Sequence, residues 1–269
     1  MRGTLYLVAT PIGNLGDITL RALETLKQVD CIACEDTRHT LQLLNHFEIK
    51  KPLISYYKQK EQEGSVQIMN LLDEGKNIAL VSDAGMPCIS DPGSVLVRKL
   101  LENGYSYTII PGANACVSAI ALTGVEGPFT FIGFLPEKNK ERIDLLRSFK
   151  ESSSNLVVYV APHDVNRVLD DLFSALGDRK LGVVKEITKI HETVMIGSLQ
   201  ETRIESPKGE YVLVIAPEDK VQVMTSDADI KNKLVELISN GISKKDAIKE
   251  ITNKYNVSKN LVYKLSLEI

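Results

Sequence analysis

The stretch Ile78-Ala79-Leu80-Val81-Ser82-Asp83-Ala84-Gly85-Met86-Pro87-Cys88-Ile89-Ser90-Asp91-Pro92-Gly93 decides how this chain is expected to fold. Its first four residues form an uninterrupted apolar run, which is typical of a parallel strand buried on both faces. A loop punctuated by glycine and proline follows, and residues 94–102 have the pattern of a helix. In open α/β sheets, ligands bind at the loops that leave the carboxyl ends of the strands. The loop at 82–93 is therefore the first candidate for a ligand site.

Outward from this stretch, strand-like and helix-like segments alternate through the first half of the chain. The apolar strand candidates are residues 3–9, 31–34, 53–56, 78–81 and 107–110. Helix candidates lie between them at 20–29, up to 46, at 62–74 and at 94–102, and an alanine-rich helix follows up to 122. Alternation with short links predicts a doubly wound, parallel α/β sheet.

The second half of the chain predicts another α/β layer and then a change of character. Strand candidates at 129–134, 156–160, 181–184 and 209–215 enclose helices at 140–149 and up to 176, with antiparallel strands expected at the end. Residues 218–225 look like a linker, and helices follow at 227–239, 244–255 and 258–267. We therefore expect an α/β protein with domains at 1–111 and 112–217 and a small helical domain at 227–269.

The helical tail admits two interpretations. From residue 227 it carries eight lysines against six acidic residues, which makes it mildly basic. Three short helices of this spacing resemble a helix-turn-helix module that binds nucleic acid. The alternative is a small helical cap that packs on the core or on a partner subunit.

Composition excludes several classes of protein. The 269 residues are 43% hydrophobic and 25% charged, with a formal net charge of -3, so any contact with RNA has to be a local patch. No apolar run approaches the roughly 20 residues that a membrane span needs. We expect a cytoplasmic protein. The four cysteines and the histidines lack metal-ligand spacing, so buried thiols and no metal are expected.

Four loops should meet at one edge of the first sheet. Residues 10–17, 35–40, 83–93 and 111–115 all leave the carboxyl ends of predicted parallel strands. Together they offer glycine-lined backbone, carboxylates and a helix amino terminus near Ala113, which suits a zwitterionic nucleoside. The alternative is that the Asp-Pro-Gly and Pro-Gly segments are only turns and caps.

Five ordered motifs carry a family resemblance: ATPIGNLGDIT at 9–19, EDTR at 35–38, SDAGMPCISDPG at 82–93, PGANA at 111–115 and GFLP at 133–136. They resemble the bacterial ribosomal RNA small-subunit methyltransferase I family. That family belongs to the tetrapyrrole-methylase-like, class III, S-adenosylmethionine methyltransferases. The resemblance runs from about residue 3 to residue 215, and the tail fits the family's small helical domain.

The resemblance implies two α/β domains of the tetrapyrrole methylase type, with the methyl donor S-adenosylmethionine in the cleft between them. It implies methylation of the 2′-hydroxyl of a cytidine in 16S ribosomal RNA, as free RNA or within the small ribosomal subunit, by a homodimer. By motif position, the residues of the donor pocket should be Pro11, Asp83, Ala84, Gly85, Ile89, Ala113, Leu135 and Pro136. Met86 and Val160 depart from the threonine and glutamate that are usual in the family.

Two other functions stay open at this point. One is a sister methylase that acts on a tetrapyrrole or another small molecule. The other is a binding or regulatory module in which the tail binds nucleic acid and the α/β part binds a nucleoside without catalysis.

A ribose hydroxyl is a poor nucleophile, so its proton must be taken or its developing charge stabilised. The catalytic candidates are Glu35, Asp36 and Arg38, which follow the strand at 31–34. Candidate contacts to RNA are Arg38, Lys189, Lys244 and Lys245. Lys185, Glu186 and Glu192 are further charged residues that are expected to face the cleft, and His163, beside Pro162 at a strand end, is the histidine most suited to a functional role.

Overall fold

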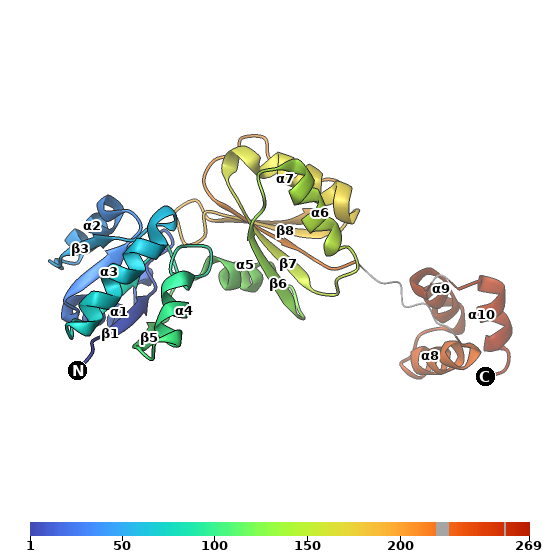
Figure 1. Ribbon diagram of the computed structural model, residues 1–269. Coiled ribbons are helices and arrows are strands. Elements are labelled where there is room, and N and C mark those ends of the chain that lie inside the picture. The colour runs from blue at the N-terminus through green and yellow to red at the C-terminus, as the bar shows by residue number, and fades with distance from the viewer. Residues whose placement is uncertain (219–225, 256) are drawn as a thin grey trace. The chain divides into compact units, whose positions relative to one another are not determined.

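The structure is a computed structural model that describes residues 1–218, 226–255 and 257–269 (Figure 1). Two compact units divide the chain, Met1–Pro217 and Glu218–Ile269. The first unit contains both β-sheets, and the described part of the second unit contains helices. Most of the predicted linker, residues 219–225, lies outside the described residues. The boundary expected between residues 111 and 112 stays a prediction.

The first sheet is parallel throughout and has the strand order β3-β2-β4-β1-β5. The predicted parallel α/β sheet is confirmed. Its strands are β1 (Thr4–Val8), β2 (Cys31–Cys34), β3 (Leu53–Ser55), β4 (Ile78–Val81) and β5 (Ser106–Ile110).

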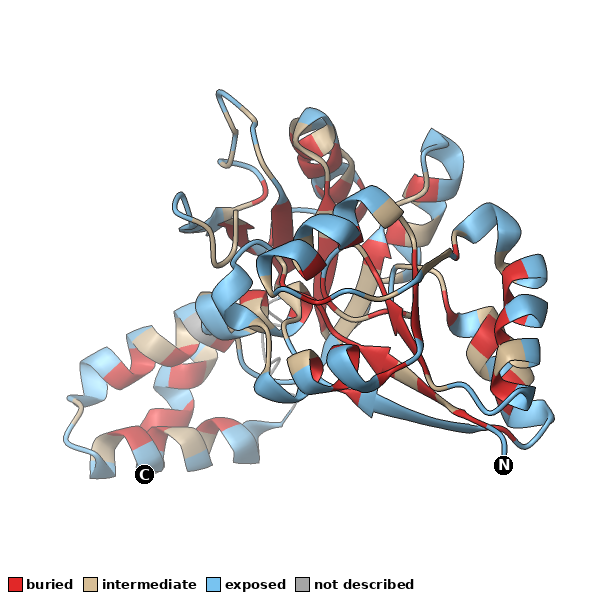
Figure 2. Ribbon diagram, turned by 90° about the vertical axis from the view of Figure 1, so that its left-hand side faces the viewer, coloured by how far each residue is buried: buried red, intermediate tan, exposed pale blue. Residues whose placement is uncertain are grey.

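Helices cover both faces of this sheet, because side chains along a strand point alternately to opposite faces. On one face Leu80 packs in a core with α3 (Glu61–Asp73) and α4 (Ser94–Glu102). On the other, Val81 packs with α1 (Leu20–Gln28) and α2 (Thr37–His46). Short 3-10 turns, η1 (Leu15–Asp17) and η2 (Lys58–Lys60), precede α1 and α3. Figure 2 shows the buried strands between the more exposed helices.

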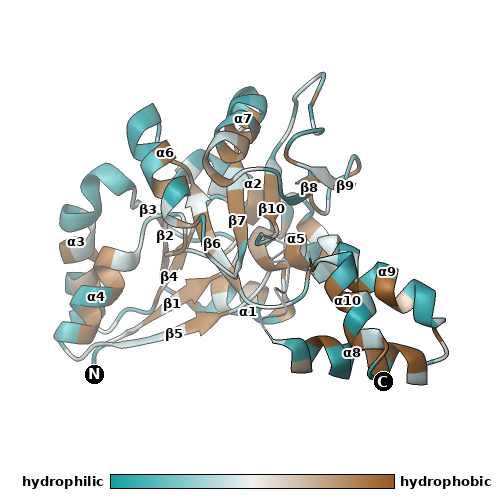
Figure 3. Cartoon of the chain, turned by 90° about the vertical axis from the view of Figure 1, so that its right-hand side faces the viewer, coloured by the Kyte–Doolittle hydropathy of each residue, from teal (hydrophilic) through white to brown (hydrophobic). Residues whose placement is uncertain are grey.

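The second sheet is mixed, as predicted, with the order β6-β7-β10-β8-β9. β6 (Phe129–Phe134) and β7 (Asn155–Val160) are parallel, whereas β8 (Lys180–Lys185), β9 (Thr193–Ser198) and β10 (Tyr211–Ile215) pair antiparallel. The strand β9 was not predicted, because it is an edge strand whose side chains are mostly exposed on both faces. Figure 3 shows the hydrophobic colour of β7 and β10 at the centre of the sheet.

Helices also cover the two faces of the second sheet. Helix α5 (Ala115–Thr123) lies on one face, and α6 (Asn139–Ser148) and α7 (Val165–Leu176) lie on the other, with η3 (Pro162–Asp164) before α7. Gly182 of β8 allows α5 to approach closely, because a Cβ atom there would lie 2.3 Å from Cγ2 of Thr123. Although α5 follows β5 of the first sheet in the chain, it therefore packs on the second sheet.

In the described part of the second unit, α8 (Asp227–Ser239), α9 (Lys244–Tyr255) and α10 (Lys259–Ser266) pack on one another around a common apolar core. The hydroxyl of Ser243 accepts a hydrogen bond from the backbone N–H of Asp246, as a helix cap does, whereas the side chain of Ser258 makes no capping bond. These contacts are compatible with both interpretations of the tail. No helix among the described residues is both long enough and apolar enough to span a bilayer.

Candidate functional site

The predicted loops meet at the carboxyl edge of the first sheet. The backbone N–H of Thr10 donates to the carbonyl of Gly85 at 2.9 Å, and the N–H of Gly85 donates back to Thr10 at 3.1 Å. The carboxylate of Asp83 accepts from the backbone N–H of Asp36 at 3.1 Å. Gly85 has φ +80°, and a Cβ atom there would lie 3.6 Å from the carbonyl oxygen of Ala113. The structure thus brings all four loops together.

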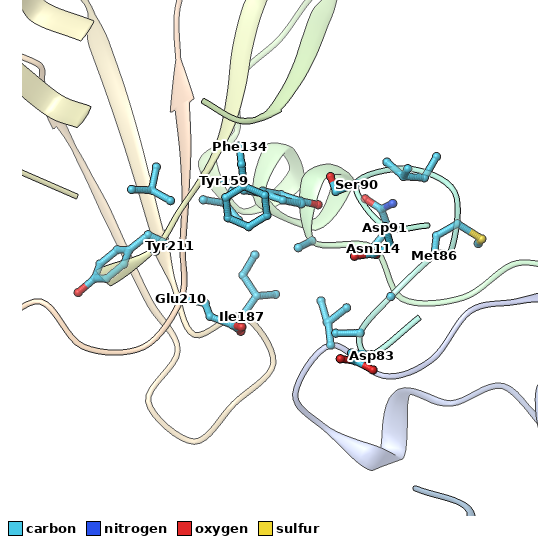
Figure 4. Close-up of a pocket in the computed structure, with 18 of the residues that line it drawn as sticks. Asp83, Met86, Ser90, Asp91, Asn114, Phe134, Tyr159, Ile187, Glu210 and Tyr211 are labelled. Carbon is cyan, nitrogen blue, oxygen red and sulfur yellow. The ribbon is translucent and has the colours of Figure 1, made fainter. Parts of the chain in front are cut away.

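A cavity of about 430 Å³ opens between these loops and the second sheet (Figure 4). The first sheet and the segment that follows β5 contribute Ile12, Glu35, Asp83, Ala84, Gly85, Met86, Ile89, Ser90, Asp91, Asn114 and Ala115. The second sheet and its loops contribute Phe134, Tyr159, Val160, Ala161, Pro162, Ile187, Glu210, Tyr211 and Val212. A pocket of this size, mostly apolar with a few polar groups, is typical of a small-molecule site.

Carboxylates dominate the electrostatics of this cavity. Glu35, Asp83, Asp91 and Glu210 line it, and no lysine or arginine does so among the described residues. Burial, followed by the nearby Asp83 and Asp91, raises the pKa of Glu35. Burial, followed by Asp83, also raises the pKa of Asp91. Crowded carboxylates favour a bound cation, because its charge offsets their mutual repulsion.

Aromatic side chains form the wall opposite the carboxylates. Figure 4 shows Phe134 and Tyr159 across the cavity from Asp83. The two rings pack edge to face at 5.6 Å, and 62% of Phe134 is exposed. Burial raises the pKa of Tyr159 to about 12, so its hydroxyl stays protonated. Such a wall offers π-faces to a cation or to a heteroaromatic ring.

Glu61 holds the far end of the loop of residues 82–93. Its Oε1 accepts a 2.8 Å hydrogen bond from the backbone N–H of Gly93 and a 3.5 Å bond from the hydroxyl of Tyr56. Tyr56 is buried and lies 3.2 Å from the hydroxyl of Ser65. Gly93 has φ +136°, and a Cβ atom there would lie 2.4 Å from Sγ of Cys88. No local sequence pattern indicates this anchor.

If the cavity binds S-adenosylmethionine, as the family resemblance implies, replacing Glu61 with alanine is expected to weaken that binding about tenfold, because the loss of a charge-assisted hydrogen bond releases the loop of residues 82–93. Glu61→Gln keeps an acceptor oxygen and should lose less than half of that effect in free energy. Isothermal titration calorimetry measures both affinities. Glu63→Ala, an exposed change on the same helix, is the control. Equal affinities for Glu61→Ala and Glu63→Ala would contradict the anchoring role.

A loop from the second sheet, residues 186–192, reaches across to the first sheet. The carbonyl of Thr188 accepts from the side-chain amide of Asn14 at 3.3 Å, and its hydroxyl donates to Asp17. Lys189 pairs with Glu186 at 2.8 Å and with Glu210 at 2.9 Å. We call residues 186–192 the clasp. Lys189, a predicted RNA contact, is thus partly buried between two carboxylates.

The three catalytic candidates are placed differently. Glu35 lines the cavity, whereas Asp36 and Arg38 do not. The carboxylate of Asp36 caps α2 by accepting from the N–H of Arg38 at 2.8 Å, and it pairs with the guanidinium at the same distance. These bonds hold the pKa of Asp36 well below its usual range. The side chain of Arg38 is 88% exposed and available to a ligand in solution.

The other predicted donor contacts fall in and beside the cavity. Asp83, Ala84, Gly85 and Ile89 line it. Ala113 lies at its edge, one residue before the N-cap Asn114 of α5. Leu135 packs against the core of the second sheet, and the carbonyl of Pro136 accepts from Arg142. Pro11 lines a smaller recess next to the cavity.

The remaining candidates lie outside the cavity. Lys244 and Lys245 are exposed at the start of α9, in the second unit. His163 is exposed and lies 3.5 Å from Asp164. Both departures from the family pattern, Met86 and Val160, line the cavity, so each changes its wall. The described residues contain no group of three His, Cys, Asp or Glu side chains that could hold a metal.

Several lining residues were missed by the sequence reasoning. They are Phe134, Ile187, Glu210, Tyr211 and Val212, which come from strands or loops of the second sheet. One sequence signal could have identified Glu210, because this carboxylate lies immediately before an apolar strand. Asp83 has a similar position, two residues beyond the end of an apolar strand. Phe134 lies within the GFLP motif, and the apolar Ile187 and Val212 carry no chemistry that marks a site.

Comparisons with known proteins agree with this geometry. The family described as Tetrapyrrole (Corrin/Porphyrin) Methylases matches residues 4–203. Ribosomal RNA small subunit methyltransferase I of Synechocystis sp. is 43% identical, over 99% of this chain and 98% of the relative. The Bacillus subtilis protein of the same name is 40% identical, over 97% of this chain and 93% of the relative.

Solved structures show the same fold at low sequence identity. Uroporphyrin-III-C-methyltransferase from Thermus thermophilus matches with a TM-score of 0.57 and 19% identity, over 80% of this chain and 94% of that chain. A diphthine synthase matches with a TM-score of 0.63 and 15% identity, over 80% and 90%. At these identities the likeness concerns the arrangement of the two sheets.

Proposed function

Because the chain belongs to the ribosomal RNA small subunit methyltransferase I family of tetrapyrrole-methylase-type proteins, we propose that it methylates 16S ribosomal RNA. The methyl group comes from S-adenosylmethionine and goes to the 2′-hydroxyl of a cytidine. The substrate is the RNA itself or the small ribosomal subunit, and the reaction takes place in the cytoplasm. We assign residues 1–111 and 112–217 to two domains that share the donor site, and residues 227–269 to a small helical domain.

The observation that carries the proposal is the chemistry of the cavity wall. S-adenosylmethionine bears a sulfonium and an ammonium group, and Glu35, Asp83 and Asp91 supply compensating charge. The backbone of Asp83 to Gly85 can approach the ligand closely, because Gly85 has no side chain. The start of α5, at Asn114 and Ala115, presents backbone N–H groups that suit the ligand's carboxylate. The residues present therefore fit this donor.

When bound, S-adenosylmethionine supplies a methyl group on a good leaving group. The chain's own residues then position the hydroxyl and manage its proton. Glu35 is the carboxylate best suited to take that proton, because its pKa is raised and it lines the cavity. Positioning by a rigid site contributes much of the rate. Asp36 acts indirectly, since it caps the helix that carries Arg38.

Donor binding is expected to tighten as the pH rises from about 4 to about 7. Without ligand, the raised pKa values of Glu35 and Asp91 leave them partly protonated at the low end. A cationic ligand favours their ionised forms, so binding releases protons. The sign for folding is opposite: a carboxyl group whose pKa is raised in the fold stabilises it at low pH, and this is lost as the pH rises through that pKa.

Calorimetry with S-adenosylmethionine at a series of pH values, in two buffers of different protonation enthalpy, measures both the affinity and the proton release. Glu35→Gln should reduce the slope of affinity against pH. An affinity that falls as the pH rises through this range would show that the carboxylates do not face the donor's charge.

Exposed cations support the contact with RNA. Arg38 lies at the amino end of α2, near the cavity loops, and Lys244 and Lys245 lie on the second unit. Phosphate contacts of this kind position an RNA without reading its sequence. Lys189, paired with Glu186 and Glu210, contributes to RNA binding only if those pairs are exchanged for phosphate.

Exposed apolar side chains support a homodimer. Ile109 on the edge strand β5 is 48% exposed, and Val117 and Leu122 on α5 are 53% and 40% exposed. An interface between two chains would cover these side chains, which lie on neighbouring segments of the chain. Sedimentation equilibrium that gives the mass of a single chain at micromolar concentration would contradict the dimer.

The function is tested with methyl-labelled S-adenosylmethionine and small ribosomal subunits, or their free 16S RNA, that lack the methyl group. We expect label on the ribose of one cytidine. Label on a tetrapyrrole and none on RNA would establish the sister methylase instead. Donor binding without turnover on any RNA would favour a binding module.

A further inference from the structure

A second recess lies beside the donor cavity. Its volume is about 200 Å³, and its lining residues are Thr10, Pro11, Gly13, Asn14, Leu15, His39, Gln42, Leu43 and Asp83. Asp83 also lines the donor cavity. The family motifs place Pro11 and Asp83 at the donor, but they assign no ligand to the other residues that line this recess.

The wall between the two spaces is a single segment of chain. Thr10 and Pro11 line the recess, and Ile12 lines the donor cavity. The paired backbone bonds between Thr10 and Gly85 hold this segment in place, and the hydroxyl of Thr10 donates to the carbonyl of Ser82 at 3.2 Å. Two ligands, one on each side of this wall, would therefore approach each other at Asp83.

The recess has the chemistry of a site for a neutral heteroaromatic ring. Leu15 and Leu43 give it apolar surface, and no lysine or arginine lines it in the described part of the chain. His39 and Gln42 are exposed on α2, and their side chains make no hydrogen bond within the described structure. Both are thus available to a ligand that carries donors and acceptors along one edge.

Asn14 has a different role at the same rim. Its side-chain oxygen accepts from the N–H of Gly16 at 2.9 Å, and its amide donates to the clasp at Thr188. Its hydrogen-bonding groups are in use, so it holds the rim in place. Gln42 is therefore the amide side chain of the recess that is available to form hydrogen bonds with the edge of a ring.

We propose that this recess holds the base of the acceptor nucleoside, with Gln42 hydrogen-bonding its edge and the ribose directed towards Asp83; this rests on the proposed function. Arg38 and Gln42 are four residues apart on α2, so they lie on the same face of the helix. A phosphate beside the base then meets the exposed guanidinium. Base, sugar and phosphate are each matched by a residue at or beside the recess.

Gln42→Trp fills the recess, and Gln42→Ala removes the amide. We expect kcat/KM for unmethylated small subunits to fall at least about 30-fold for Gln42→Trp and about tenfold for Gln42→Ala, the range for losing one base contact. The dissociation constant of S-adenosylmethionine should stay within about twofold, since Gln42 does not line the donor cavity. Gln67→Trp, on an exposed position of α3 that lines neither space, is the matched control.

The outcomes separate clearly. Thermal melting verifies that the variants are folded. A loss of donor affinity in Gln42→Trp would assign the recess to the donor and overturn the proposal. Unchanged kcat/KM in both Gln42 variants, with a wild type that methylates the subunits, would overturn it while leaving the proposed function intact. A wild type that methylates no RNA would refute both.

Discussion

Asp83→Asn is expected to weaken binding of S-adenosylmethionine about 100-fold, which corresponds to about 2.7 kcal/mol. Asparagine keeps the shape of the side chain and an oxygen that can accept from the N–H of Asp36, so the loops should stay in place. The change removes one negative charge from a cavity that has no lysine or arginine among its described lining residues. A cationic donor then loses the charge that compensates its own. A hydrogen bond to a charged group alone contributes about 1.5–3 kcal/mol, which agrees with the expected loss.

Asp83→Ala should be worse, because it also leaves the N–H of Asp36 without its acceptor. Calorimetry gives both affinities, and Asp144→Asn on an exposed position of α6 controls for the change of net charge. Wild-type affinity in Asp83→Asn would show that the donor's positive groups lie elsewhere.

Arg142→Met is expected to lower the free energy of unfolding of the first unit by about 3–5 kcal/mol, because it removes a buried guanidinium and leaves the largely buried carboxylate of Asp171 with only a 4.0 Å contact to Arg167. Arg142 is 3% exposed, and its Nε lies 2.6 Å from the carboxylate of Asp171. Its Nη1 donates to the carbonyls of Pro136 and Glu137 at 3.0 and 2.7 Å. The guanidinium therefore joins α6, α7 and the segment after β6.

Urea unfolding measures this loss, with Arg147→Met as the matched control. Arg147 is exposed on the same helix, and its replacement should cost less than about 0.5 kcal/mol. Donor affinity should also fall in Arg142→Met, because the segment it holds directly follows Phe134. Similar unfolding free energies for the two variants would contradict the role of the buried pair.

The sequence was sufficient for the fold wherever local pattern and tertiary position agree. The apolar run at 78–81 is a buried strand, and Thr19 caps α1 by accepting from the N–H of Ala22 at 3.1 Å. The family motifs also led to the loops that line the cavity. Alternation alone could not decide which residue at the end of β6 faces the cavity. A register shift between Phe131 and Gly133, where Gly133 has φ +76°, breaks the period of two.

Long-range contacts account for the rest. Glu61 and Gly93 are 32 residues apart, and no local signal links a helix carboxylate to the end of a loop. Glu210 and Tyr211 reach the cavity through strand order, which the sequence pattern does not fix. Asp36 shows the reverse problem: its polar motif predicts a catalytic role, which stays a prediction, and no local pattern showed that its carboxylate also caps α2.

The clasp has a mechanical consequence. Glu186 and Thr188 have φ angles of +53° and +65°, a conformation that costs residues other than glycine about 1–3 kcal/mol each. The bonds of Thr188 to Asn14 and Asp17 hold this conformation together with bonds inside the clasp, such as the one from the N–H of Thr188 to Glu192. If the clasp separates from the first sheet, relaxation of this backbone would offset part of the free energy of the hydrogen bonds that are lost. We therefore expect the clasp to be the part of the cavity wall that moves at the lowest cost in free energy when a ligand enters or leaves.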